Sequence, residues 1–131
     1  MSYLLDTSVF LWALSSPERL NHDARELLSN DRDELFFSSA SAWEISVKYA
    51  IGKVALPTTR GHCVPALLQR WGIRPLDITH AHALAVLELP LHHADPFDRL
   101  LVAQTTLEGM TLVTADRAFE KYGVKLFWCG T

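Results

Sequence analysis

The chain has 131 residues, of which 49% are hydrophobic, and its formal net charge is −3. This size and composition suit one hydrophobic core, so we expect a single domain over residues 1–131. No apolar run reaches the roughly eighteen residues that a membrane-spanning helix requires, and we expect a cytoplasmic protein without membrane association. The negative charge argues against a broad basic face of the kind that binds duplex nucleic acid.

Short apolar runs alternate with longer amphipathic segments along the sequence. In chain order they predict a strand at residues 3–5, a helix at 9–14, a helix that begins at Asn21 or Asp23 and ends near residue 28, a strand at 34–37, and a helix that opens within 38–41 and runs to 51. There follow a looser segment from Leu56 and Pro57, a helix at 64–71, a strand at 73–76, and helices at 81–89 and 96–108. The last elements are a strand at 111–114, a short helix from Asp116 to about residue 122, and a strand at 124–127.

Strands that alternate with helices predict an α/β fold, with a central parallel sheet of four to five short strands flanked by α-helices. Open parallel sheets bind ligands beyond the carboxyl ends of their strands. Asp6 directly follows the first predicted strand, and Asp116 follows the strand at 111–114. The sequence therefore places both acids at the edge of the sheet where a ligand is expected.

Two further acids, Asp95 and Asp98, lie at the start of the helix at 96–108. A structural interpretation explains both of them. Asp95 is the N-cap, Pro96 is the first helical residue, and Asp98 at the N3 position reaches back to the N–H of the cap. Helix capping alone could therefore account for this pair.

The other acids also have structural interpretations when each is taken alone. Asp6 and Asp116 can cap the helices that follow them. Glu44 can complete a capping box with Ser41 or pair with Lys48 one turn later. The joint pattern points elsewhere, because helices that start at the carboxyl edge of a parallel sheet direct their first turns toward one crevice. We therefore expect these acids to converge there with the second aspartate of the helix at 96–108.

Three or four converging carboxylates must take up protons or bind a cation, because they repel one another. A site made only of oxygen ligands suits Mg²⁺ or Mn²⁺. Two such ions, roughly 3.5–4 Å apart, can activate a water and stabilise the leaving oxygen of a phosphodiester. The cations would also attract an anionic substrate to an acidic protein.

Four blocks of the sequence resemble the PIN-domain ribonucleases, and most closely the VapC-like toxins of bacterial toxin-antitoxin pairs. In chain order the blocks are LLDTSVFLWAL, SSASAWEISVKYAIGKVALP, HHADPFDRLLVAQ and GMTLVTADRAFEKYGV. They span nearly the whole chain, and several blocks in the right order are a specific signal. The resemblance implies one PIN-like domain.

The resemblance also implies that Asp6, Glu44, Asp98 and Asp116 form an acidic quartet that holds Mg²⁺, with Mn²⁺ as a substitute. It implies a metal-dependent endoribonuclease that leaves a 5′-phosphate, a homodimer, and an inhibitory VapB-like antitoxin. We match Asp98 to the family's third acid because it directly precedes the apolar run of its helix. Asp95 then remains a helix cap or a second group beside the metal.

Two hydroxyl residues are candidates for the support of such a site. Ser8 stands where many relatives carry a histidine, and its hydroxyl can cap the helix or bind a water at the metal. Thr114 resembles the family's usual Ser or Thr two residues before the last acid, and we expect it to orient carboxylates or water. The alternative for Thr114 is an ordinary threonine at a strand end.

Arg99 is a candidate contact to a phosphate or to an antitoxin carboxylate, and Lys48 is a candidate guide for RNA, although both residue types are common on solvated helix faces. His92 and His93 precede a helix without a partner at helical spacing, so we expect solvated loop histidines. Trp43 can stack on a base, but packing in a core or an interface is its more frequent use.

Other classes with acids at strand ends fit less well. A phosphoacceptor receiver domain needs paired acids near the first strand, where this chain has Asp6 alone. A haloacid-dehalogenase-like phosphatase carries Asp-x-Asp there, whereas Ser8 occupies the second acidic position. A non-catalytic PIN-like domain that docks a basic partner peptide stays open as an alternative, and RNA cleavage without a partner distinguishes it from the enzyme.

Overall fold

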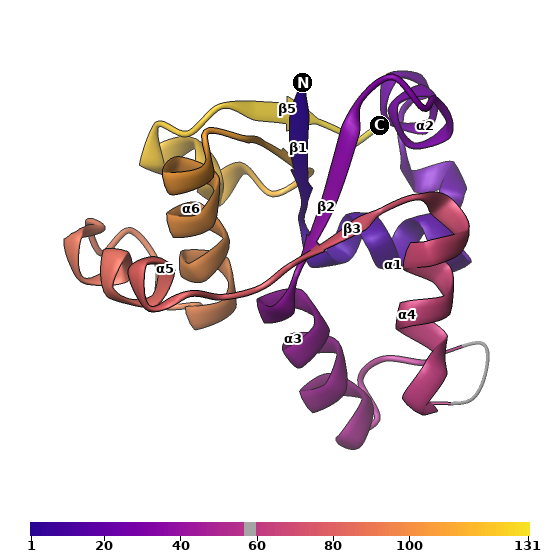
Figure 1. Cartoon of the computed structure of the whole chain (residues 1–131), viewed down its shortest axis with the longest axis horizontal. Helices are drawn as coiled ribbons and strands as arrows, with labels where there is room; N and C mark the ends of the chain where they lie inside the picture. The colour runs from indigo at the N-terminus through magenta and orange to yellow at the C-terminus, as the bar shows by residue number, and fades with distance from the viewer. Residues whose placement is uncertain (57–59) are drawn as a thin grey trace.

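The computed structural model describes residues 1–56 and 60–131 (Figure 1). Its strands are β1 Ser2–Leu5, β2 Glu34–Ser38, β3 Arg74–Leu76, β4 Thr111–Thr114 and β5 Leu126–Trp128. Its α-helices are α1 Thr7–Ser15, α2 His22–Ser29, α3 Ser39–Ala50, α4 Arg60–Trp71, α5 His80–Ala85 and α6 Pro96–Glu108, and its 3-10 helices are η1 Pro17–Arg19, η2 Val86–Glu88 and η3 Arg117–Tyr122. No helix in the described ranges is long and apolar enough to cross a membrane.

The five strands form one parallel sheet in the order β3-β2-β1-β4-β5. This confirms the predicted α/β fold with a central parallel sheet. From β1 the chain builds outward through β2 to β3, then crosses to the other side of β1 to form β4 and β5. The direction of winding therefore reverses between β1 and β4, and α/β sheets bind ligands beyond the carboxyl ends of the strands at such a switch point.

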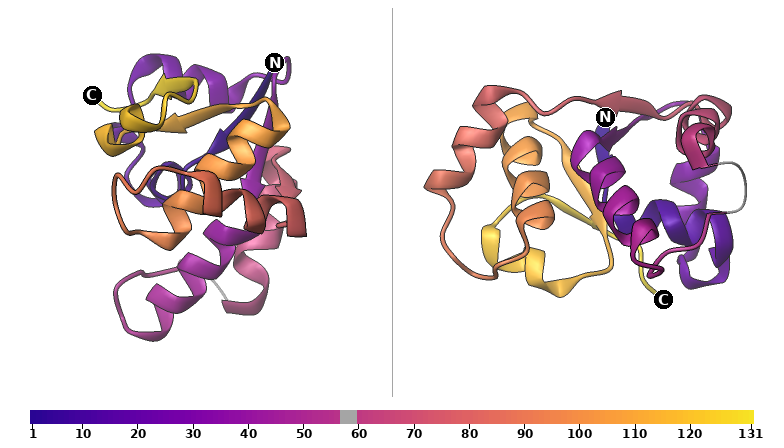
Figure 2. Two further views of the ribbon diagram at one scale, coloured as in Figure 1. Left: turned by 90° about the vertical axis from the view of Figure 1, so that its left-hand side faces the viewer. Right: turned by 90° about the horizontal axis from the view of Figure 1, so that it is seen from below.

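Helices cover both faces of the sheet, as the apolar strands predict. Successive residues of β1 point to opposite faces, so Leu5 packs in one core cluster with Phe10, while Leu4 packs in a second cluster with Leu101. In Figures 1 and 2, α1, α2 and α4 lie on one side, α5 and α6 lie on the other, and α3 lies between the two groups. The helix α3 thus stands beside the carboxyl ends of the central strands.

The register of the sheet aligns the ends of its central strands. Leu5 of β1 pairs with Phe37 of β2 and with Val113 of β4. These paired residues directly precede Asp6 and Thr114 in the sequence. Side chains that follow β1 and β4 therefore start from the same edge of the sheet.

Several predicted elements differ from the observed ones. The helix predicted at 81–89 is divided into α5 and η2, because the turn tightens where the N–H of Val86 donates to the carbonyl of Ala83. The helix predicted at 64–71 already begins at Arg60 and carries Pro65 in its interior. The helix after Asp116 is a 3-10 helix. The looser segment predicted from Leu56 and Pro57 lies partly in residues 57–59, which are outside the described residues, and its later part lies in α4.

Candidate active site

Asp6 stands at the end of β1, where its backbone opens α1 as the N-cap. The predicted capping role of its side chain is not observed, since the carboxylate makes no capping hydrogen bond. Its Oδ2 instead accepts hydrogen bonds from Thr114 Oγ1 at 2.8 Å and from Ser8 Oγ at 3.4 Å. Burial raises the pKa of Asp6 to about 6, against the opposing effect of the Thr114 hydrogen bond. Asp6 is thus a buried acid whose carboxylate does not cap α1.

Thr114 joins the ends of β1 and β4. Its hydroxyl donates to Asp6 and accepts from the N–H of Asp116 at 3.0 Å. Asp116 caps η3, because its Oδ1 accepts from the N–H of Ala118 at 2.9 Å. Thr114 is fully buried, whereas Asp116 is exposed. The hydroxyl of Thr114 therefore orients the carboxylate of Asp6 directly and holds Asp116 through the backbone N–H of Asp116.

Glu44 lies in the second turn of α3 and is 5% exposed. Its Oε2 forms an ion pair with Lys48 one turn later, and this hydrogen bond raises the pKa of Lys48. Its Oε1 is the one buried side-chain N or O atom in the described part of the chain that has no hydrogen-bond partner. Because a buried carboxylate oxygen without a partner is costly, this atom marks a place where a ligand is expected.

The two aspartates at the start of α6 have separate roles. Asp95 is the N-cap, and its Oδ1 accepts from the N–H groups of Phe97 at 2.9 Å and Asp98 at 3.1 Å. The predicted return bond from the N–H of Asp95 to the side chain of Asp98 is not found among the described contacts. Burial, followed by the charges of the other four acids described above, raises the pKa of Asp98 to about 8. Asp95 therefore fixes the helix start, and Asp98 does not serve the cap.

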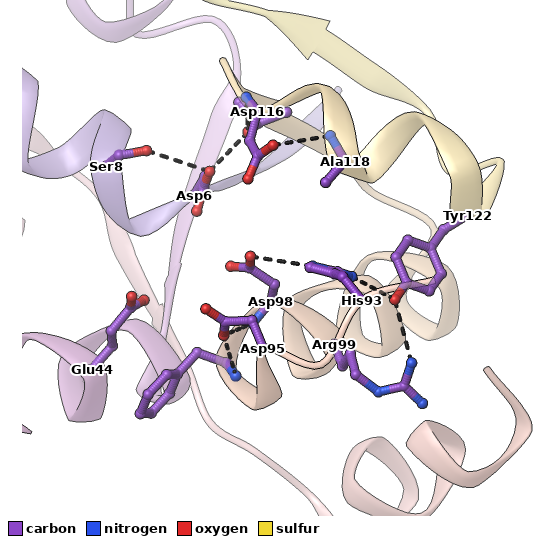
Figure 3. A network of polar contacts seen from close by, with 12 residues as sticks. Asp6, Ser8, Glu44, His93, Asp95, Asp98, Arg99, Asp116, Ala118 and Tyr122 are labelled. Atoms are coloured by element: carbon purple, nitrogen blue, oxygen red, sulfur yellow. Dashed lines mark hydrogen bonds and ion pairs between the residues drawn. The ribbon is translucent and has the colours of Figure 1, made fainter. Parts of the chain in front are cut away.

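The four acids of the predicted quartet come from four places in the fold and face a common space (Figure 3). Asp6 follows β1, Asp116 follows β4, Glu44 lies on α3 and Asp98 lies on α6. Their mutual repulsion contributes to the raised pKa values of Asp6 and Asp98. The structure therefore brings the four carboxylates to the switch point of the sheet.

The four carboxylates surround this space loosely. Among the described residues, one group of three His, Cys, Asp or Glu side chains has ligand atoms that all lie within 4.8 Å of one another, and it consists of His22, Asp23 and Glu26 on the surface of α2. The quartet is therefore wider than a closed shell of protein ligands. This spacing suits Mg²⁺, which usually keeps several waters and takes one or two carboxylates directly.

The residues present fit a divalent cation. All of the donors are carboxylate oxygens, which Mg²⁺ and Mn²⁺ accept as ligands. Glu44 Oε1 is buried without a partner, and the pKa of Asp98 is raised to about 8. Both observations indicate excess negative charge at this site. The ion pair between Glu44 and Lys48 neutralises only part of it. A cation held by these acids would compensate it.

His93 is the main residue near these acids that sequence reasoning missed. The sequence predicts a solvated loop histidine, and this prediction is wrong: Nε2 lies 3.3 Å from Asp98 Oδ2, and Nδ1 lies 2.7 Å from the Tyr122 hydroxyl. His92 is exposed and packs edge to face on Tyr122. The only signal in the sequence is that His93 lies two residues before the N-cap of α6, and this does not reveal the contact with Tyr122.

Arg99 points into the protein. Its Nη1 donates to the carbonyl of Pro90 at 2.9 Å and to the Tyr122 hydroxyl at 3.3 Å. These contacts hold the loop before α6 and do not favour the predicted contact of Arg99 with RNA or an antitoxin. Lys48, by contrast, keeps 41% of its side chain exposed next to the acids.

Comparison with known proteins identifies the family of this chain. A family model described as the PIN domain matches residues 3–125. Ribonuclease VapC22 of Mycobacterium tuberculosis is 30% identical over 124 residues, which cover 91% of this chain and 90% of that protein. Ribonuclease VapC16 of the same organism is 36% identical over 61 residues, so this match spans 47% of the chain and less than half, 43%, of that protein.

A solved structure has the same fold. VapBC2 from Rickettsia felis, bound to a DNA fragment from its promoter, superposes with a TM-score of 0.76 at 20% sequence identity. The superposition covers 98% of this chain and 99% of that chain. The fold, the family model and the match to VapC22 over nine tenths of both chains agree, and the chain therefore belongs to the PIN domain family.

Proposed function

We propose that the chain is a metal-dependent endoribonuclease that acts as the toxin of a toxin-antitoxin pair. The observation that carries this proposal is the buried Glu44, whose Oε1 has no hydrogen-bond partner among the described residues and whose carboxylate faces three further carboxylates. The raised pKa of Asp98, about 8, supports the same excess of negative charge. The names of the relatives VapC22 and VapC16, both called ribonucleases, support the activity.

The proposed ligands of one or two Mg²⁺ ions, with Mn²⁺ as a substitute, are Asp6, Glu44, Asp98 and Asp116. When bound, such ions supply Lewis-acid chemistry for phosphodiester hydrolysis, which activates water for in-line attack and stabilises the leaving oxygen. Thr114 and Ser8 fix the direction of the Asp6 carboxylate through their hydroxyl groups. Asp95 fixes the first turn of α6 and thereby the place from which Asp98 reaches the site.

Lys48 is the proposed contact to the RNA backbone. Its ammonium group is partly exposed and already lies against Glu44, at the edge of the acidic site. A lysine here can bind a phosphate without reading a base, because phosphate contacts position a nucleic acid and carry no sequence information. Together with the cations, it offsets a net charge of −3 that would otherwise repel RNA.

We also propose a VapB-like antitoxin and a second copy of the chain as protein partners. The name of the solved relative VapBC2 supports the antitoxin. An exposed apolar stripe along α3 and its C-cap supports a protein interface, because Trp43, Val47 and the C-cap Ile51 recur every four residues and are 58%, 40% and 62% exposed. Sedimentation equilibrium of the purified protein, run beside Val47→Lys, measures whether the chain dimerises and whether this stripe is the interface.

The test of the activity is cleavage of a fluorescent structured RNA by the purified protein. Reactions contain Mg²⁺, Mn²⁺ or EDTA, and Asp98→Asn is compared with Asp95→Asn. The two substitutions are matched, since both replace an aspartate at the start of α6 by its amide, and asparagine caps helices as well as aspartate does. Circular dichroism verifies that each variant is folded.

The proposal predicts cleavage that needs a divalent ion, is lost in folded Asp98→Asn and is kept in Asp95→Asn. Cleavage that survives both EDTA and Asp98→Asn would overturn it and identify a contaminating nuclease. Absence of cleavage on varied RNAs by a folded protein that binds Mg²⁺ would overturn the activity in favour of a non-catalytic domain that docks a partner.

A further inference from the structure

Three side chains that the quartet does not include connect Asp98 to the loop before α6 (Figure 3). His93 lies in that loop, Tyr122 ends η3, and Arg99 follows Asp98 on α6. The contacts run from Arg99 Nη1 to the Tyr122 hydroxyl at 3.3 Å, from that hydroxyl to His93 Nδ1 at 2.7 Å, and from His93 Nε2 to Asp98 Oδ2 at 3.3 Å. One continuous chain of polar contacts therefore ends on a carboxylate of the acidic site.

Arg99 is the fixed end of this series of polar contacts. Its guanidinium donates to three backbone carbonyls, those of Pro90, Val86 and Leu89, at 2.9, 3.2 and 3.4 Å. Several carbonyls that accept from one planar group fix its position and orientation. The Nη1 atom that also meets Tyr122 therefore cannot turn freely toward another partner.

The chemistry of the two ends determines where the protons lie between them. A guanidinium only donates, so the Tyr122 hydroxyl accepts from Arg99. No other acceptor for this hydroxyl is found among the described residues, and its own proton is left to donate to His93 Nδ1. A neutral imidazole that accepts at Nδ1 carries its proton on Nε2, and an ionised Asp98 only accepts. All three contacts then have one donor and one acceptor each.

We propose that His93 is a positioning residue, whose Nε2–H holds the ionised Asp98 carboxylate in place, and that Arg99 and Tyr122 fix the tautomer that allows it to do so. The inference rests on the proposed function only in that Asp98 is treated as a metal ligand. The hydrogen bond engages Oδ2, whereas Oδ1 has no donor among the described residues. His93 thereby leaves one oxygen of Asp98 available to a cation.

The surroundings favour this role. The side chains of His93 and Asp98 are 22% and 15% exposed, so water competes weakly for the contact between them. The imidazole also packs edge to face on Phe119, which is fully buried, with 6.1 Å between the ring centroids. The ring is therefore held by the core on one side and by Tyr122 on the other. Partners that orient a metal ligand in this way typically change metal affinity by about 10–100-fold when they are removed.

The first test measures Mg²⁺ affinity by calorimetric titration, which does not depend on RNA cleavage. We expect His93→Ala to weaken binding about tenfold or more, while His93→Gln, whose amide can still donate to Asp98, recovers part of the loss. Tyr122→Phe keeps the ring and removes only the hydroxyl, and we expect a smaller loss. The matched control is His92→Ala, because the exposed His92 packs on the ring of Tyr122 and its side chain has no hydrogen bond to Asp98 among the described contacts. This variant should bind Mg²⁺ as the wild type does.

The second test reads the tautomer directly. Long-range ¹⁵N–¹H spectra of histidine-labelled protein, taken in saturating Mg²⁺ and also in EDTA at pH 9, distinguish a proton on Nε2 from one on Nδ1. At pH 9 Asp98, whose pKa burial raises to about 8, is largely ionised without a metal. We expect His93 to carry its proton on Nε2 in the wild type and to become a mixture of tautomers in Tyr122→Phe, with no change in His92→Ala.

The outcomes separate this inference from the proposed function. If the wild type cuts no RNA but His93 has its proton on Nε2 and His93→Ala weakens Mg²⁺ binding, the nuclease proposal fails and the positioning role stands. If His93 carries its proton on Nδ1, or if folded His93→Ala binds Mg²⁺ as tightly as the wild type, the positioning role is overturned whatever the cleavage assay shows.

Discussion

Two acidic clusters of this molecule differ in burial and spacing, and the difference bears on the proposed metal site. On α2, His22, Asp23 and Glu26 have ligand atoms within 4.8 Å of one another, yet all three residues are exposed. At the switch point of the sheet the carboxylates lie farther apart, but Glu44 and Asp6 are only 5% and 6% exposed. Solvent screens exposed charges and leaves little reason to bind an ion, whereas buried carboxylates keep their repulsion. Burial without compensation, rather than short distance, therefore distinguishes the two clusters.

The largest expected difference between the clusters is in catalysis. Asp98→Asn removes a charge from the cluster at the switch point and should lower RNA cleavage at least about a hundredfold, since loss of a proposed metal ligand should cost more than loss of a residue that only orients it. Asp23→Asn makes the same change on α2 and should leave cleavage unchanged. Initial rates at saturating Mg²⁺ measure both effects. Equal loss in the two variants would remove the distinction between the clusters.

The next effect is on stability and depends on pH. In an unfolded chain an aspartate releases its proton near pH 4, whereas folded Asp98 and Asp6 have pKa values of about 8 and about 6. Between pH 4 and 8 the folded state therefore binds more protons than the unfolded state, and the free energy of unfolding of the metal-free protein should fall as the pH rises. Mg²⁺ should offset this loss, so it should raise Tm more at pH 8 than at pH 5.5.

Thermal melts in EDTA and in Mg²⁺ at several pH values measure this effect. Other groups also titrate over this range, so the wild type is compared with Asp98→Asn, which should show a shallower loss of stability and be the more stable metal-free protein at pH 8. Asp23→Asn serves as the control and should follow the wild type. Parallel pH profiles for the wild type and Asp98→Asn would show that the charge of the half-buried Asp98 is compensated without a metal.

A smaller effect is expected at Thr114, whose hydroxyl orients two acids of the cluster at the switch point. Thr114→Val removes the hydroxyl that donates to Asp6 and accepts from the N–H of Asp116, so both acids lose their orientation. Cleavage should fall roughly tenfold, in the range typical of partners that orient metal ligands. Thr114→Ser keeps the hydroxyl and should retain most of the rate. If valine and serine behave alike, the hydroxyl has no part in the site.

The smallest effect is expected at Asp95, an acid beside the cluster that caps α6. Asp95→Ala removes the acceptor for the N–H groups of Phe97 and Asp98 and should lower the free energy of unfolding by about 1 kcal/mol. Asp95→Asn retains a good cap and should cost less. Urea denaturation in EDTA measures the difference between the two. A neutral Asp95→Ala would mean that the cap does not hold the start of α6.

Local patterns in the sequence predicted much of this arrangement. The parallel sheet followed from apolar strands that alternate with helices, and the placement of Asp6 and Asp116 followed from the ends of two such strands. Pro96 and the capping preference of Asp95 predicted the N-cap of α6, which the structure has. These features depend on neighbours within a few residues, which a sequence displays. The capping pattern did not separate the two aspartates, and Asp98 was assigned to the quartet only through the resemblance to the PIN-domain family.

The contacts that the sequence did not predict join distant segments. Thr114 donates to an acid 108 residues away, and His93 meets Tyr122 across 29 residues. The sequence predicted that Thr114 would orient a carboxylate or a water only through a resemblance, and for Tyr122 it offered nothing. The inward turn of Arg99 has the same origin, because its partners are carbonyls of η2 and of the loop that follows it, whose path the pattern of residues does not fix.

The most direct test of the difference between the two clusters is the location of a bound ion. Trace Mn²⁺ added to ¹⁵N-labelled protein broadens the amide resonances nearest to the ion. If uncompensated buried charge determines where the ion binds, broadening is centred on the residues around Asp6, Asp98 and Arg117, at the carboxyl edge of the sheet. Asp98→Asn should then reduce this broadening. Broadening centred on α2 around Asp23 and Glu26, with the residues around Asp6 and Asp98 unaffected, would contradict this expectation.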